Sequence, residues 1–160
     1  MSKAASSRRL LFGFDPGVAA WVCERIPHVR DFGPCAAIGV MTGGRLVAGV
    51  VYHDYQPDFG SVQLSMAADS STWARRELIA GLLHYPFEQL GCWSVFTLTP
   101  EDNKKAVKVN EHIGFKKKTI LPHAFGKKRH AVFCQMLKPD YIDRYGDLNG
   151  EIQPIAAARA

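Results

Sequence analysis

The hydrophobic positions of this 160-residue chain follow two periods that replace each other several times along the sequence. Alternating or continuously apolar runs, which predict strands, cover residues 10–14, 36–42, 45–55, 61–67, 93–99, 116–122 and 130–137. Apolar residues at helical spacing cover residues 15–26, 73–91 and 103–113. The predicted order is strand, helix, three strands, helix, strand, helix and two strands.

This order predicts an α+β domain with a mixed, mostly antiparallel central sheet of about seven strands flanked by helices. We assign residues 1–138 to this single domain. Hydrophobic periodicity is lost from Lys138 onward, so residues 139–160 are expected to form a C-terminal tail that is peripheral or partly mobile.

Several element boundaries carry specific signals. Asn103 is a candidate N-cap for the third helix, and Gly114 is a candidate left-handed C-cap that ends it. Pro86 inside the second helical pattern predicts a kink or a lost hydrogen bond. Gly43 and Gly44 predict a two-residue hairpin turn, and Gly49 in the next strand predicts a bulge or a close backbone approach.

The composition, with 47% hydrophobic and 11% aromatic residues, is sufficient for a buried core. No apolar run approaches the length that spans a bilayer, and the run beginning at Leu10 is too short for a signal peptide. The four cysteines are scattered and form no C-x-x-C pair. This usage predicts reduced thiols in a cytoplasmic protein, no metal site and no membrane association.

The formal net charge of +5 is concentrated in one part of the chain. Between Lys104 and Arg129 nine lysines and arginines stand against a single acid, Glu111. Such a cluster indicates either a phosphate-bearing ligand or polyanion, or a solvated face of a basic protein.

Two stretches resemble the GNAT-type N-acetyltransferases. Residues 103–115, NKKAVKVNEHIGF, are similar to the last helix of that superfamily, which ends in Gly-Phe. Residues 73–91, WARRELIAGLLHYPFEQLG, are similar to the central helix of its ribosomal-protein-acetylating branch. The compact first half also resembles small acetyltransferases found among phage and prophage proteins. The predicted order of elements is that of the GNAT, or acyl-CoA N-acyltransferase, fold, with a shortened connection after the first strand.

The resemblance implies acetyl-CoA as co-substrate, with its pyrophosphate held by backbone N–H groups at the start of the central helix. The positions that match this start are Ser71, Thr72, Trp73, Ala74, Arg75 and Arg76. The small residues that the family carries in this loop are replaced here by Trp73 and Arg75. Arg75 and Arg76 either compensate by contacting phosphate directly or face water. Asn103 matches an asparagine that contacts the pantetheine arm as well as capping the helix.

Acetyl transfer to a primary amine also requires a general base and a group that protonates the leaving thiolate. Glu101 and His53 are candidate bases, as are Asp54 and His112. His53 alternates with apolar neighbours, so an ordinary half-buried sheet position explains it as well, and Glu101 could simply favour the adjacent helix N-terminus.

Asn110 occupies the position of the tyrosine that often protonates the thiolate in the family. An amide can donate a hydrogen bond but gives up no proton at neutral pH. Water or another residue would then protonate the thiolate.

The leading hypothesis is therefore an acetyl-CoA-dependent N-acetyltransferase acting on an amine acceptor, with a protein or peptide amine favoured by the branch resemblance. The alternative is a non-catalytic acyl-CoA or nucleic-acid binding protein on a degenerate acetyltransferase fold. Few aromatic residues are interleaved with the lysines, so nucleic acid is not favoured. An exposed edge in the last hairpin would suit a homodimer.

Overall fold

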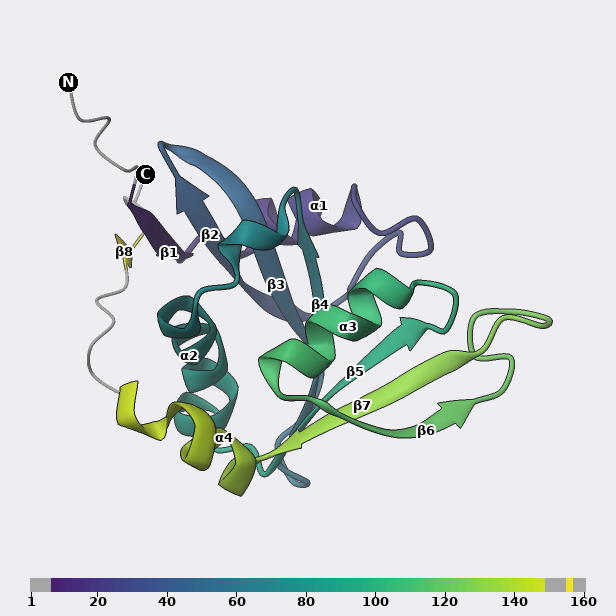
Figure 1. Ribbon diagram of the computed structural model, residues 1–160. Coiled ribbons are helices and arrows are strands. Elements are labelled where there is room, and N and C mark those ends of the chain that lie inside the picture. Colours follow the sequence, from purple (N-terminus) through teal and green to yellow (C-terminus); the bar gives the residue numbers. More distant parts are fainter. Residues whose placement is uncertain (1–6, 149–154, 157–160) are drawn as a thin grey trace.

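The computed structural model describes residues 7–148 and 155–156, and these residues form one mixed sheet with helices on both faces (Figure 1). The strands are β1 (Arg8–Phe12), β2 (Cys35–Thr42), β3 (Arg45–Gln56), β4 (Ser61–Ala68), β5 (Ser94–Pro100), β6 (Lys116–Leu121), β7 (Ala131–Leu137) and β8 (Ile155–Ala156). Their order across the sheet is β6-β7-β5-β4-β3-β2-β1-β8. Among the described strands only β4 with β5 and β1 with β8 pair in parallel, so the predicted mostly antiparallel sheet is confirmed.

The helices are α1 (Asp15–Cys23), α2 (Arg76–His84), α3 (Lys104–Ile113) and α4 (Lys138–Tyr145), with short helical turns η1 (Ser71–Trp73), η2 (Tyr85–Gln89) and η3 (Gly146–Leu148). On one face of the sheet, α1 packs Val18 and Val22 against Ala37 of β2 and Val51 of β3. The main core lies on the other face, which α2, α3 and α4 cover (Figure 1).

A pair of glycines lets α1 approach the sheet closely. Gly39 of β2 and Gly49 of β3 lie directly opposite each other. A Cβ added to Gly49 would lie 2.8 Å from Val22 Cγ2 and 3.0 Å from Val18 Cγ1, closer than packed carbon atoms approach. The close backbone approach predicted at Gly49 is therefore confirmed.

The predicted continuous helix over residues 73–91 is wrong at its start. η1 is followed by Arg75 in extended conformation (φ −79°, ψ 145°), so α2 begins only at Arg76 and has no side-chain N-cap. The Ser70 hydroxyl accepts a hydrogen bond from the Thr72 N–H at 3.2 Å. The cap signal in the sequence thus serves the short turn before the helix rather than α2 itself.

The irregularity predicted at Pro86 is confirmed. η2 is a π-helical turn that contains Pro86. Because Pro86 has no N–H, the backbone widens locally, and the Leu90 N–H donates to the Tyr85 carbonyl at 3.0 Å across five residues.

Both predicted ends of α3 are confirmed. The Asn103 side chain accepts a hydrogen bond from the Ala106 N–H at 3.2 Å. Gly114 has a φ of +121°, and after it the Phe115 N–H donates to the Asn110 carbonyl at 3.0 Å. Gly-Phe therefore ends the helix and brings the buried Phe115 ring into the core.

The part of the chain after Leu137 differs from the expected peripheral tail. Residues 138–145 form α4, and Tyr141 and Tyr145 are buried in the main core. The Tyr141 ring stacks on Phe87 with centroids 4.8 Å apart. α4 thus belongs to the folded domain, because two tyrosines four positions apart give it an apolar face. Of the predicted tail, 149–154 and 157–160 lie outside the described residues.

Candidate functional site

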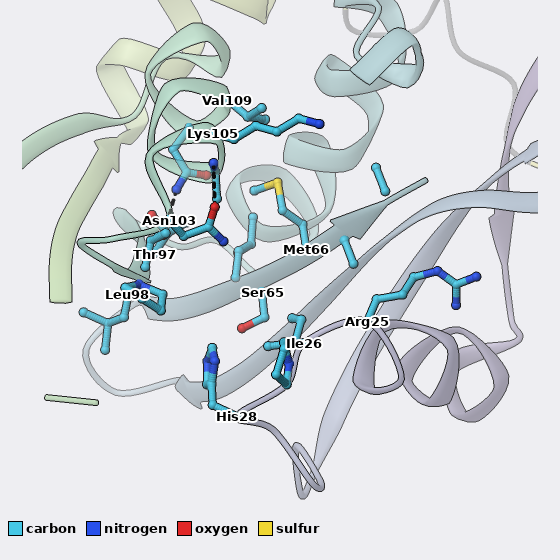
Figure 2. Close-up of a pocket in the computed structure, with 18 of the residues that line it drawn as sticks. Arg25, Ile26, His28, Ser65, Met66, Thr97, Leu98, Asn103, Lys105 and Val109 are labelled. Carbon is cyan, nitrogen blue, oxygen red and sulfur yellow. Dashed lines mark hydrogen bonds between the residues drawn. The ribbon is translucent and has the colours of Figure 1, made fainter. Parts of the chain in front are cut away.

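The candidate site is a cleft between two strands that separate. The parallel strands β4 and β5 pair only between Ser61–Gln63 and Ser94–Phe96, and beyond these three pairs they diverge. A cleft of about 590 Å³ opens between their carboxyl ends (Figure 2). Parallel strands of an open sheet commonly present ligand sites at this end.

Four parts of the chain form the walls of the cleft. Residues 64–68 of β4 and residues 97–100 of β5 provide two walls. The third is provided by the N-cap Asn103 together with Ala106 and Asn110 of α3. Residues 25–28, which follow α1, lie on the opposite side from Asn103 in Figure 2 and provide the fourth together with Arg129.

A buried amide lies in the α3 wall of the cleft. Asn110 is only 4% exposed, and its Nδ2 donates a hydrogen bond to Thr99 Oγ1 at 3.0 Å. Both residues line the cleft. One hydrogen of the Asn110 amide is therefore engaged with β5.

A hydrogen-bonded chain of three side chains reaches the cleft from β3. His53 is 7% exposed and does not line the cleft, but its Nε2 lies 2.8 Å from the hydroxyl of Ser65, which does. Its Nδ1 lies 2.6 Å from Asp54 Oδ2. A carboxylate only accepts, so Nδ1 donates in this contact, and in the neutral imidazole Nε2 is then the acceptor for the serine hydroxyl. Ser65 could not be identified from the sequence, because it resembles any polar residue on an alternating strand.

Two ion pairs occupy the rim of the cleft. Arg25 Nε lies 2.8 Å from Asp69 Oδ1, and this hydrogen bond holds the pKa of Asp69 below its ordinary value. Arg129 Nε lies 3.3 Å from Asp102 Oδ2. Burial, together with the nearby positive charge of Arg129, lowers the pKa of His28 on the same rim. The carboxylates that line the cleft among the described residues are thus each paired with an arginine.

The residues predicted to hold the cofactor are only partly brought together. Trp73 and Asn103 line the cleft, and Trp73 is buried. Thr72 lies in η1, and its hydroxyl accepts a hydrogen bond from Arg8 at 3.0 Å. Ser71 also belongs to η1, and the half-buried Ala74 follows that turn.

Arg75 and Arg76, at the start of α2, differ in their contacts. Arg76 donates to the Arg144 carbonyl at 2.6 Å and pairs with Asp147 at 3.1 Å, so it binds the C-terminal segment. Arg75 is exposed, and its side chain makes no hydrogen bond or ion pair within residues 7–148. Of the pair, only Arg75 is available to an anionic ligand.

Two candidate bases lie outside the cleft. Glu101 is exposed in the turn after β5 and is not part of the lining. His112 is exposed on α3, where its carbonyl accepts a hydrogen bond from Arg144. Of the predicted bases, His53 and Asp54 are those connected to the cleft by hydrogen bonds.

Two further findings concern the described part of the chain. No group of three or more His, Cys, Asp or Glu side chains there is arranged to hold a metal ion. None of its helices combines the length and the apolar character needed to cross a membrane.

No protein-family model and no curated protein matches the chain. Solved structures of the spermidine/spermine N-acetyltransferase SpeG from Vibrio cholerae are similar to it. Mutant forms of SpeG align with a TM-score of 0.71 at 16% identity over 86% of this chain and 99% of theirs. A dodecameric structure gives 0.68 at 17% identity over 89% and 99%. A complex with CoA and spermine gives 0.58 at 19% identity over 69% of each chain. The chain therefore has the GNAT, or acyl-CoA N-acyltransferase, fold.

Proposed function

From this fold, we propose that the chain is an acetyl-CoA-dependent N-acetyltransferase that moves an acetyl group to a primary amine. The observation that carries the proposal is the cleft between the diverging carboxyl ends of β4 and β5. Its volume of about 590 Å³ suits part of acetyl-CoA, and its lining includes residues of α3 as well as residues 25–28. Cofactor and acceptor can therefore approach from opposite faces.

In this proposal acetyl-CoA enters on the side of α3 and α2. The first N–H groups of α2 have no partner within the helix and carry a partial positive charge, which suits a pyrophosphate. Arg75 and the cleft-lining Lys105 add charge for the phosphates. Asn103 and Trp73, which line the same side, contact the arm that carries the thioester.

The amine attacks the thioester carbonyl after losing a proton, and the C–S bond then breaks to release the thiol. His53 is the base in this proposal, because among the predicted bases its imidazole is the one linked to the cleft, through Ser65. The second Asn110 Nδ2 hydrogen, which does not bind Thr99, donates a hydrogen bond to the reacting group in this proposal, and the amide gives up no proton.

We retain a protein or peptide amine as the acceptor. The complex of the similar SpeG protein contains spermine, a polycation. In this chain the two carboxylates that line the cleft, Asp69 and Asp102, are already paired with Arg25 and Arg129. A polycation would have to displace these arginines, whereas a single amine would not.

Self-association remains a prediction. The edge strand of the last hairpin is β6, and its residues Lys116, Lys117 and Lys118 are exposed. Like charges on an edge strand oppose direct pairing between two copies. A homodimer would therefore form through another surface, and light scattering in high and low salt measures its presence.

The alternative is a non-catalytic binding protein for acyl-CoA or nucleic acid. Two observations favour this alternative. Arg76 forms an ion pair with Asp147, and Asn110 replaces the expected tyrosine. Two measurements distinguish an acetyltransferase from a protein that only binds its ligand. Calorimetry with acetyl-CoA reports binding, and release of free CoA thiol in the presence of an amine panel reports transfer.

The expected result is saturable acetyl-CoA binding and thiol release that depends on the amine, with a peptide amine preferred to spermidine. Binding without transfer to any amine supports the acyl-CoA-binding alternative. No binding of acetyl-CoA, with a salt-dependent shift of DNA or RNA on a gel, supports the nucleic-acid alternative and contradicts the proposed function.

A further inference from the structure

We propose that Ser65, His53 and Asp54 form a proton relay in which the Ser65 hydroxyl meets the acceptor amine and passes its proton to His53. This inference rests on the proposed function and adds two residues to it. Ser65 would be a catalytic residue, because it touches the amine, and Asp54 a positioning residue that acts through His53.

The geometry is that of a nucleophile or donor, a base and an orienting carboxylate. Ser65 Oγ lies 2.8 Å from His53 Nε2, and His53 Nδ1 lies 2.6 Å from Asp54 Oδ2. His53 is 7% exposed and does not line the cleft, so a substrate in the cleft meets Ser65 first. In Figure 2, Ser65 lies between Asn103 on one side and Ile26 and His28 on the other. The amine would thus reach the serine from the side of residues 25–28.

A backbone irregularity makes the contact between His53 and Asp54 possible. Neighbouring residues of a regular strand point to opposite faces of the sheet. The register between β3 and β4 shifts between His53 and Gln56, and Asp54 has a φ of +52°. This left-handed conformation is unfavourable for a residue with a side chain. Here it turns the carboxylate back toward the imidazole, which is how bulges re-aim side chains beside functional sites.

No other charge directly contacts the His53 imidazole within the described residues. On β2 its cross-strand neighbour is Cys35, and burial together with the carboxylate of Asp15 raises the pKa of that thiol, which keeps it neutral. From the segment before β2, the Phe32 ring lies 5.0 Å from the imidazole. Asp31, in the same segment, accepts a hydrogen bond from Gly33. Among the described residues, Asp54 is therefore the charged group in direct contact with the imidazole.

The relay leaves the serine unchanged. The acceptor arrives as an ammonium ion and gives one proton to Ser65 Oγ, while the hydroxyl proton moves to His53 Nε2. The neutral amine forms the C–N bond, the C–S bond breaks, and the second amine proton goes to the thiolate. His53, charged next to Asp54, then releases its proton to water, so one amide, one thiol and one proton are formed.

The test compares the pH dependence of kcat/KM for the parent, Ser65→Ala, Ser65→Thr, His53→Gln and Asp54→Asn, with a short peptide and with spermidine as acceptors. Ser61→Ala, at the start of the same strand and outside the cleft, is the matched control. Calorimetry measures acetyl-CoA affinity for every variant, and thermal unfolding verifies that each is folded.

We expect Ser65→Ala and His53→Gln to lower kcat/KM by about 100-fold and to flatten its acid limb, with acetyl-CoA affinity unchanged. Ser65→Thr keeps the hydroxyl and should restore the profile. Asp54→Asn should lower kcat/KM with acetyl-CoA affinity unchanged, because an amide can turn its NH2 group toward Nδ1 and then no longer keeps Nε2 as the acceptor. Ser61→Ala should match the parent.

An active parent whose profile is the same in Ser65→Ala overturns the relay alone. A peptide containing Ser65 that gains the mass of one acetyl group from acetyl-CoA, without amine, also overturns it, because the serine would then be a nucleophile. A parent that transfers to neither acceptor overturns the proposed function and the relay together.

Discussion

The Asn110 amide nitrogen lies 3.0 Å from the hydroxyl oxygen of Thr99, and this buried hydrogen bond joins α3 to β5 at the wall of the cleft. Asn110→Ala removes the donor and leaves a buried hydroxyl without it. The free energy of unfolding in urea should fall by about 1–3 kcal/mol. Thr99→Val should be coupled to it in a double-mutant cycle, whereas Thr119→Val on the exposed part of β6 should not. Additive effects of Asn110→Ala and Thr99→Val would show that the bond contributes nothing to stability.

The arginines at the start of α2 should separate binding from stability. Arg75→Ala removes a cation that has no hydrogen bond or ion pair within residues 7–148, so acetyl-CoA should bind roughly tenfold more weakly, which corresponds to about 1.4 kcal/mol. Arg76→Ala should leave this affinity unchanged and lower Tm, because Arg76 binds the Arg144 carbonyl and Asp147. Calorimetry and thermal unfolding of both variants provide the test. Equal losses of affinity would mean that Arg76 leaves Asp147 to contact the cofactor.

Gly49, which lies beneath α1, should not accommodate a side chain unless the helix moves away from the sheet. Gly49→Ala places a methyl group against Val22, and we expect the protein to lose about 1–3 kcal/mol of stability. In the double variant with Val22→Ala the added effect of Gly49→Ala should be smaller than in the parent background, because the valine methyl that it meets is absent. Urea unfolding of both single variants and the double variant measures this coupling. An equal cost in both backgrounds would contradict the proposed contact.

The charge of Asp140 should make α4 sensitive to acid. The hydrogen bond from Lys116 lowers the pKa of Asp140 in the folded protein, and the Leu137 N–H contributes as a second donor. A carboxyl with a lowered folded pKa stabilises the protein above its unfolded pKa of about 3.9, and this contribution is lost as the pH falls through the folded value. Asp140→Asn, which keeps an oxygen to accept from Leu137, should therefore be less stable than the parent at pH 7.

That difference should shrink as the pH falls below the unfolded pKa of about 3.9, and it should disappear once the pH is below the lowered folded pKa, where both proteins carry a neutral group. Thermal unfolding from pH 7 to pH 2.5 measures it. Asp143→Asn, at an exposed position of α4 with no ion pair within the described residues, is the matched control and should show no such trend. A constant difference between Asp140→Asn and the parent at all pH values would assign the effect to packing.

The burial of α4 predicts unequal effects at adjacent residues. Tyr141 is fully buried against Phe87, and Tyr141→Ala should lower the free energy of unfolding by about 3–5 kcal/mol. Ile142 is 51% exposed, so Ile142→Ala should cost about 1 kcal/mol or less. If both variants lost only about 1 kcal/mol or less in denaturant unfolding, residues 139–148 would instead be the peripheral tail predicted from the sequence.

The features that could be predicted from the sequence are those set by residues close together in the chain. The Asn103 cap and the Gly114 exit of α3 depend on side chains within a few positions, and both are confirmed. Pro86 acts on its own turn. The start of α2 could not be located, because the Ser70 cap signal is real but serves η1. Pro139 and the pair Tyr141 and Tyr145 were the available signals for α4, over too short a run to show helical periodicity.

The contacts of the candidate site depend on the fold and were correspondingly harder to predict. His53 and Ser65 are twelve positions apart and meet only because β3 and β4 are neighbours in one register. Asp54 reaches His53 because its backbone is left-handed, and an aspartate in the sequence does not by itself predict that conformation. Arg76 binds the Arg144 carbonyl because of the position of α4, and the sequence pattern did not predict that helix.

The three residue pairs that join β4 to β5 have a mechanical consequence. They divide the sheet into two half-sheets, β1–β4 with β8 and β5–β7, that are connected at one end of β4 and β5 and open at the other. The backbone amides of residues 64–68 that face the opening lack a strand partner, so a ligand with amide groups can serve as one. We therefore expect hydrogen exchange on both sides of the opening to slow when the cleft is filled. Ligand binding in the cleft would then determine whether the two half-sheets fluctuate separately or as one rigid body.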